Sequence, residues 1–146
     1  MKTKVFLDSN ILLDLIFDRA HSLESRIIFS AVMSNHIQAV VTTQSLIDIS
    51  YVIENKSPER INRLFELYDQ FMKRMDIAYI DFFNIKEARE DYSGDYEDDA
   101  QFRCAEDAYC HYFITSDKKI QENKRSEYMT VISPGAFVEL MTGNGH

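Results

Sequence analysis

The stretch that decides the fold is Val5-Phe6-Leu7-Asp8-Ser9-Asn10-Ile11-Leu12-Leu13-Asp14-Leu15-Ile16-Phe17. Its first three residues form a short unbroken apolar run, which is typical of a strand buried on both faces of a sheet. Residues 10–17 then predict a short helix. A strand that passes at once into a helix is the start of a βαβ unit, so this stretch favours a parallel sheet.

The same alternation continues along the chain. Short apolar runs predict four further strands, and the longer stretches between them have the 3.6-residue period of helices. We therefore expect an α/β fold with helices on both faces of a sheet of about five strands. We expect one domain over residues 1–146, ending in a short flexible tail. The expected strands are residues 5–7, 38–41, 77–80, 112–115 and 129–132, and the expected helices are residues 10–17, 22–35, 44–54, 57–75, 84–92, 95–109 and 133–143.

The amino-acid composition and charge exclude some classes of function. The 146 residues carry 16 Lys and Arg against 24 Asp and Glu, a formal net charge of −8. This argues against a protein that wraps nucleic acid by bulk charge, but not against an enzyme that meets phosphates through metal ions. No run of about 18 apolar residues is present, so we expect no membrane span. No signal-like apolar run is found, and two cysteines that we expect to stay reduced fit a cytoplasmic protein.

Acids and hydroxyl residues gather where the predicted strands end. Asp8 follows the first strand, and Asp48 lies about one turn into the helix after the second strand. Thr115 ends the fourth strand, and Asp117 comes two residues later. Ligands of open parallel sheets bind at the carboxyl ends of the strands, so these residues are candidates for one site.

The helix over residues 95–109 offers one more carboxylate, and the helical period selects Asp98. Asp98 shares a largely apolar face with Gln101 and Phe102, whereas Asp99 shares a charged face with Arg103. We therefore expect Asp98 to point inward, near the positive end of the helix dipole, and Asp99 to point to solvent.

Four carboxylates in one cleft, Asp8, Asp48, Asp98 and Asp117, would repel one another without cations. Oxygen-only ligands suit Mg²⁺ or Mn²⁺, and two such ions activate a water and stabilise the leaving oxygen of a phosphodiester. The alternative is that each Asp is an ordinary solvated or capping residue. Spacing alone favours neither interpretation.

Several motifs, in order, resemble the PIN-domain nuclease family. Residues 5–12 resemble its opening motif, an apolar strand followed by Asp, a small hydroxyl residue and Asn. Residues 96–105 are similar to its third acidic motif, and residues 112–119 to its fourth, an apolar strand that ends in Thr-x-Asp. Residues 131–137 resemble the closing strand and Ser-Pro-led helix, and the resemblance covers residues 4–140.

The resemblance implies a three-layer α/β/α fold and a Mg²⁺- or Mn²⁺-dependent nuclease that usually acts on RNA. It implies that Asp8, Asp98 and Asp117 bind metal. Asp48 would be a catalytic acid at a position where the family most often has Glu, one methylene longer. The implied supporting residues are Ser9, Asn10 and Thr115.

Small bacterial members of this family are mostly VapC-like toxins of toxin–antitoxin pairs. The resemblance therefore also implies a homodimer and an antitoxin partner whose tail enters the acidic groove. Positive charge is concentrated after the fourth strand, at Lys118, Lys119, Lys124 and Arg125. These residues either contact RNA phosphates or form a solvated loop. Arg60 and Arg63 are expected to be surface charge.

Two other functions remain open at this stage. The shorter Asp48 and the charge of −8 fit a degenerate PIN-like module that binds protein or RNA without cleavage. A receiver-like phosphoacceptor domain also has an acidic pocket at strand ends, and there Asp81 would have to be the acceptor. The first turn offers only Asp8, whereas such a domain wants a pair of acids.

Overall fold

Parallel strands form the centre of the molecule. In the computed structural model, which describes residues 2–19 and 22–143, five strands pair in the order β3-β2-β1-β4-β5. All four pairings are parallel. The expected tail over residues 144–146 lies outside the described residues. The strands are β1 (Lys4–Leu7), β2 (Gln38–Thr42), β3 (Met75–Ala78), β4 (Tyr112–Ile114) and β5 (Thr130–Ile132).

The central strand β1 is apolar on both of its faces because helices cover both sides of the sheet. Successive side chains of a strand point to opposite faces. Val5 and Leu7 accordingly pack in one apolar cluster, and Phe6 packs in the other. The ring of Phe6 stacks on that of Phe113 in β4, with centroids 4.9 Å apart. The unbroken run of residues 5–7 thus reflects a strand buried on both faces, as predicted.

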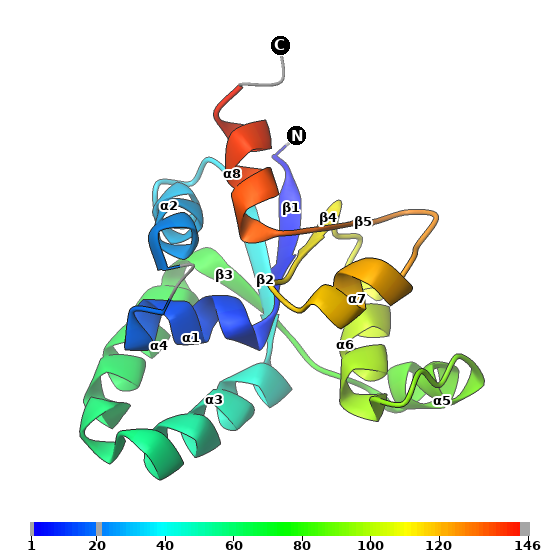
Figure 1. Cartoon of the computed structure of the whole chain (residues 1–146), viewed down its shortest axis with the longest axis horizontal. Coiled ribbons are helices and arrows are strands. Elements are labelled where there is room, and N and C mark those ends of the chain that lie inside the picture. The colour runs from blue at the N-terminus through cyan, green and yellow to red at the C-terminus, as the bar shows by residue number, and fades with distance from the viewer. Residues whose placement is uncertain (1, 20–21, 144–146) are drawn as a thin grey trace.

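The helices form the two outer layers (Figure 1). The layer beside Val5 and Leu7 contains α1 (Ser9–Phe17), α2 (Ser22–Met33), α3 (Thr43–Lys56), α4 (Ile61–Arg74) and α8 (Pro134–Met141). The layer beside Phe6 contains α6 (Tyr96–Asp107) and α7 (Lys118–Asn123), and α5 (Phe82–Glu90) lies against α6. The predicted three-layer α/β/α fold is therefore confirmed.

Some boundaries differ from the prediction. The helix expected over residues 57–75 begins with a short 3-10 turn, η1 (Pro58–Arg60), and ends at Arg74. Met75 is already extended and pairs with Ala39, so β3 begins two residues earlier than expected. Asn84 does not cap α5. Asp81 does: its side chain accepts from the Asn84 backbone nitrogen, and the Asn84 side-chain oxygen accepts from the Asp81 backbone nitrogen. The capping box therefore lies three residues earlier than predicted.

Arg63 lies at the surface as expected and Arg60 is half-buried, and both also bind the end of α1. The Arg60 guanidinium donates to the carbonyl of Ile16 at 2.7 Å, and that of Arg63 donates to the carbonyl of Leu15. These carbonyls belong to the last turn of α1, where no intrahelical donor is available. The two cations therefore cap α1 from η1 and α4, which lie more than forty residues later in the chain.

The remaining general expectations concern membranes and thiols. Within the described ranges, none of the helices has the length and apolar character needed to cross a bilayer. Cys104 and Cys110 are both free and buried, as expected for thiols that do not bridge each other.

Candidate active site

The first turns of several helices meet at the carboxyl edge of the sheet (Figure 1). Helices α1, α3, α6 and α7 each begin with a side-chain cap there. In each case the capping oxygen accepts a hydrogen bond from a backbone nitrogen in the first turn, as helix N-termini require. The caps are Asp8, Thr42, Asp95 and Asp117, which accept from Ser9, Ser45, Asp98 and Lys119 respectively.

Asp8 is the most buried of the four predicted acids, with 8% of its surface exposed. Its Oδ1 accepts from the Ser9 backbone nitrogen at 2.8 Å. Its Oδ2 accepts from the buried Thr115 hydroxyl at 2.8 Å. Burial raises the pKa of Asp8, and the hydrogen bonds from Thr115 and Ser9 oppose that rise. The Thr115 hydroxyl also accepts from the Asp117 backbone nitrogen at 3.0 Å, so it connects two of the predicted acids.

Asp98 completes a group of three acids from separate parts of the chain. It is half-buried, and burial together with the negative charge of Asp95, Asp8 and Asp117 raises its pKa to about 7. Asp98 and Asp117 line one cavity of about 370 Å³ together with Lys119. The structure thus brings Asp8, Asp98 and Asp117 within electrostatic reach of one another.

Asp48 joins this group through a residue that the sequence analysis missed. Glu97 of α6 faces Asp48 of α3, and its interaction with the Asp48 carboxyl group is the main cause that raises the pKa of Glu97 to about 8. Oδ1 of Asp48 accepts from Gln44, but Oδ2 is buried without a hydrogen-bond partner among the described residues. A shared proton or a cation would satisfy it. Glu97 lies next to Asp98 inside the third acidic motif, and this position is the signal in the sequence that could have identified it.

The expectation for Asp99 is wrong. Its side chain is buried, with 2% exposed, and it forms an ion pair with Lys124. The backbone nitrogen and hydroxyl of Ser93 also donate to it, at 2.8 and 2.6 Å. Burial alone would raise the pKa of Asp99, but the bonds from Lys124 and Ser93 outweigh burial and lower it. The helical period failed here because the charged face of α6 is covered by distant residues.

The basic residues after β4 divide into two groups. Lys118 and Lys119 lie exposed in the first turn of α7, and Lys119 lines the cavity. Lys124 pairs with Asp99, and Arg125 donates to backbone carbonyls. Residues 118–123 form a helix and not the loop of the alternative interpretation, although Lys118 and Lys119 are solvated as that interpretation expected. Among these four basic residues, the side chains of Lys118 and Lys119 have no ion-pair partner within the described part of the chain.

Three further predicted positions have clear surroundings. Ser9 and Asn10 lie half-buried in the first turn of α1, where both hydrogen-bond with Asp8. Asp81, the acceptor that a receiver domain would need, caps α5 after the edge strand β3. It is separated from Asp8 by strand β2, so the receiver-like interpretation is wrong.

A comparison with protein families shows which family has this fold and these motifs. Residues 4–119 match the PIN domain family. The chain belongs to this family. No curated protein matches it closely enough to add a nearer relative.

Solved structures share the fold of this PIN domain at low sequence identity. VapBC2 from Rickettsia felis, bound to a promoter DNA fragment, is 15% identical over 90% of this chain and 98% of its own, with a TM-score of 0.65. VapC20 from Mycobacterium tuberculosis, a toxin that cleaves the sarcin-ricin loop, is 8% identical over 84% and 97%, with a TM-score of 0.67. A toxin–antitoxin complex from Klebsiella pneumoniae is 19% identical over 89% and 97%, with a TM-score of 0.60.

The donor atoms of this PIN domain fit a hard divalent cation. Every candidate ligand is a carboxylate oxygen, the type that Mg²⁺ and Mn²⁺ prefer. Within the described ranges, no three His, Cys, Asp or Glu side chains converge closely enough to hold one ion among them. Mg²⁺ commonly uses one or two carboxylates and keeps several waters, so the site fits a partly hydrated ion that is held by one or two of Asp8, Asp98 and Asp117 at a time.

Proposed function

We propose that this PIN domain is a Mg²⁺- or Mn²⁺-dependent endoribonuclease that hydrolyses RNA phosphodiester bonds. The observation that carries the proposal is that Asp8, Asp98 and Asp117 lie close enough to repel one another. Together with burial, this repulsion raises the pKa of Asp8 and of Asp98, and a bound cation would relieve it. The sarcin-ricin loop that VapC20 cleaves is a structural precedent for RNA as the substrate of this fold.

We assign a separate role to each residue of the site. Asp8, Asp98 and Asp117 would hold the metal, which when bound supplies the activation of water and the stabilisation of the leaving oxygen. Thr115, Ser9 and Asn10 orient Asp8 by their hydrogen bonds. Asp48, with Glu97, would act as a further catalytic acid at the edge of the same group. Lys119, and Lys118 beside it, would contact RNA phosphates.

The same proposal includes partners. Three of the similar structures are toxin–antitoxin assemblies, from Rickettsia felis, Klebsiella pneumoniae and Salmonella typhimurium. We therefore infer that this chain is the toxin of such a pair, that an antitoxin inhibits it, and that it forms a homodimer. Mixing with the antitoxin should abolish RNA cleavage.

The decisive experiment compares the parent with Asp98→Asn. Mn²⁺ binding is measured by electron paramagnetic resonance, and cleavage is measured on total RNA with and without added metal. We expect Asp98→Asn to lose cleavage by more than about 100-fold, the upper end of what outer-shell partners of a metal contribute. Asp69→Asn, an exposed residue on α4, is the matched control and should cleave as the parent. Equal activity of Asp98→Asn and the parent would show that the site is wrongly assigned.

A second candidate is a PIN module that binds RNA or protein without cleavage. The observation that favours it is the absence of three converging ligands within residues 2–19 and 22–143, together with the short Asp48. This candidate predicts no Mn²⁺ binding at millimolar metal and no metal-dependent cleavage, while partner binding is retained.

A further inference from the structure

A buried ion pair lies beside the candidate active site. Asp99 of α6 and Lys124, directly after α7, are 2% and 13% exposed, and Nζ of Lys124 contacts Oδ1 of Asp99. Ser93 donates two hydrogen bonds to the same carboxylate. The lysine nitrogen also lies 5.7 Å from the centre of the Phe102 ring. Both charges are therefore held in one geometry by several partners.

Stability alone is a weak reason for such a pair. Removing two charges from water is costly, and a neutral pair of similar shape often stabilises a fold as well or better. Removing only one partner is strongly unfavourable, because the other charge is then buried alone. A buried pair of this kind offers mainly a fixed distance and direction between the segments that it joins.

The segments joined here carry two of the proposed metal ligands. Asp99 directly follows Asp98. The Ser93 that it holds begins the loop to Asp95, and Oδ1 of Asp95 accepts from the Asp98 backbone nitrogen at 3.0 Å. This loop turns at Gly94, whose φ of 107° is a conformation that side chains rarely adopt.

Lys124 makes the corresponding connection on the other side of the cavity. It is the C-terminal cap of α7, and its backbone nitrogen donates to the carbonyl of Ile120. The N-terminal cap of the same short helix is Asp117. Ser93, Asp98, Asp117 and Lys124 all line the cavity of about 370 Å³. The apolar contact between α6 and α7, which includes Phe102 and Ile120, fixes no direction by itself.

We propose that Asp99 and Lys124 are a positioning pair that sets the separation of Asp98 and Asp117 and so the affinity of the site for a divalent cation. The pair touches neither metal nor substrate. This inference rests on the proposed function, because it concerns the same site. Asp99 and Lys124 lie 25 residues apart, and no motif or helical period connects them.

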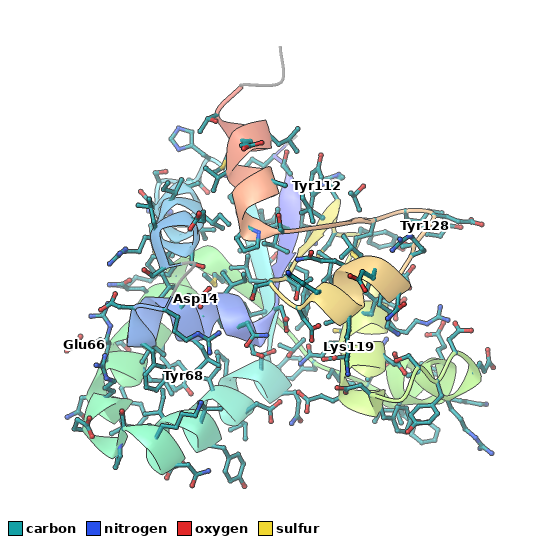
Figure 2. All side chains as sticks on the ribbon, in the orientation of Figure 1. Asp14, Glu66, Tyr68, Tyr112, Lys119 and Tyr128 are labelled. Carbon is teal, nitrogen blue, oxygen red and sulfur yellow. The ribbon has the colours of Figure 1, made fainter. Side chains whose placement is uncertain are left out.

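The test measures Mn²⁺ affinity and thermal stability of the full chain in parallel. The variants are Asp99→Asn, Lys124→Met and the double variant that carries both. Affinity is measured with Mn²⁺ alone by electron paramagnetic resonance, at a temperature at which circular dichroism shows every variant folded. Asp14→Asn is the matched control, because Asp14 is also buried and bound to a hydroxyl and a cation, Ser25 and Arg19 (Figure 2). It lies between α1 and α2, outside the cavity.

We expect each single variant to lower Tm and to weaken Mn²⁺ binding about tenfold or more, as loss of outer-shell support does. In the double variant Tm should return toward that of the parent, because no charge is left buried alone. Its Mn²⁺ affinity should stay about tenfold weak, because the directional link between α6 and α7 is still absent. Asp14→Asn should lower Tm and leave the Mn²⁺ affinity unchanged.

Two results would overturn the inference while leaving the proposed function intact. One is an unchanged Mn²⁺ affinity in Asp99→Asn and in the double variant. The other is an affinity in the double variant that recovers together with Tm, as a purely structural pair would require. If the parent itself binds no Mn²⁺, the proposed metal site fails and this inference fails with it.

Discussion

At the scale of single residues, the Thr115 hydroxyl is the most constrained group of the candidate site. It is fully buried, donates its one proton to Asp8 and accepts from the Asp117 backbone nitrogen. One hydroxyl therefore fixes both the rotamer of Asp8 and the start of α7. A buried acceptor that loses its donor costs the fold about 1–3 kcal/mol.

Replacing Thr115 by Val keeps the shape and removes this hydroxyl. We expect Thr115→Val to destabilise the protein by about 1–3 kcal/mol, because Oδ2 of Asp8 loses its donor. We also expect Mn²⁺ binding about tenfold weaker. Thr115→Ser retains the hydroxyl and should stay near the parent in both properties. Urea unfolding and Mn²⁺ titration provide the two measurements, and equal behaviour of the Val and Ser variants would contradict the assigned role.

At the scale of elements, η1 and α4 support the candidate site indirectly, because they bind the end of α1 that lies far from Asp8. Helix α1 begins at Asp8, and its other end is capped by Arg60 and Arg63 from η1 and α4. The Arg60 guanidinium also lies over the Phe17 ring, 5.4 Å from its centre. The two ends of α1 are thus held by different parts of the chain, which fixes the direction from which Asp8 enters the site.

The cap at the far end of α1 can be tested by Arg60→Met, which keeps an apolar stem. We expect a loss of about 1–2 kcal/mol in unfolding free energy, since a charge-assisted hydrogen bond and a cation–π contact are both removed. Arg74→Met removes the same charge from an exposed position on α4 and should cost less than about 0.5 kcal/mol. Chemical denaturation of both variants is the measurement, and equal losses would show that the cap contributes nothing beyond charge.

How much of this could be predicted from the sequence depends on how local the cause is. The strands and their parallel direction could be predicted from short apolar runs such as residues 5–7 that alternate with helices. The proximity of Asp8 and Asp117 could be predicted because the ends of parallel strands share one edge of the sheet. The roles of Arg60, Asp99 and Glu97 depend on partners on other elements, namely Ile16, Lys124 and Asp48. A helical period describes one helix in isolation, so it assigned Asp99 to solvent and left Glu97 unnoticed.

At the scale of the whole molecule, negative charge is both abundant and concentrated. The net charge is −8, and the carboxyl edge of the sheet gathers Asp8, Asp98 and Asp117 with Asp48 and Glu97 nearby. Without a cation, the folded state resists ionisation of Asp8, Asp98 and Glu97 more than the unfolded chain does, because the pKa of each is raised by burial and neighbouring carboxyl groups. Folding, pH and metal binding are therefore coupled through one site.

This coupling predicts how stability depends on pH. The pKa of Asp98 is raised from 3.8 to about 7 and that of Glu97 from 4.5 to about 8. Between about pH 5 and pH 8 the folded state thus holds more protons than the unfolded state, so stability falls as pH rises. Asp99, whose pKa is lowered, keeps its stabilising effect throughout this range and loses it only in stronger acid. We expect the Tm of the metal-free protein to fall by at least a few degrees between pH 5 and pH 8. A loss of about 1 kcal/mol in unfolding free energy lowers Tm by ~2–4 °C at this chain length.

Divalent metal and one variant separate this effect from general charge repulsion. Ligands must be deprotonated to bind, so saturating Mg²⁺ should raise Tm more at pH 8 than at pH 5 and should flatten the profile. The double variant Glu97→Gln/Asp98→Asn should flatten it without metal and should no longer respond to Mg²⁺. Thermal unfolding at constant ionic strength, with chelator or with Mg²⁺, tests both statements. A Tm that is constant or rises from pH 5 to pH 8 in the metal-free parent would mean that these carboxyl groups ionise freely. The site would then have no electrostatic need for a cation.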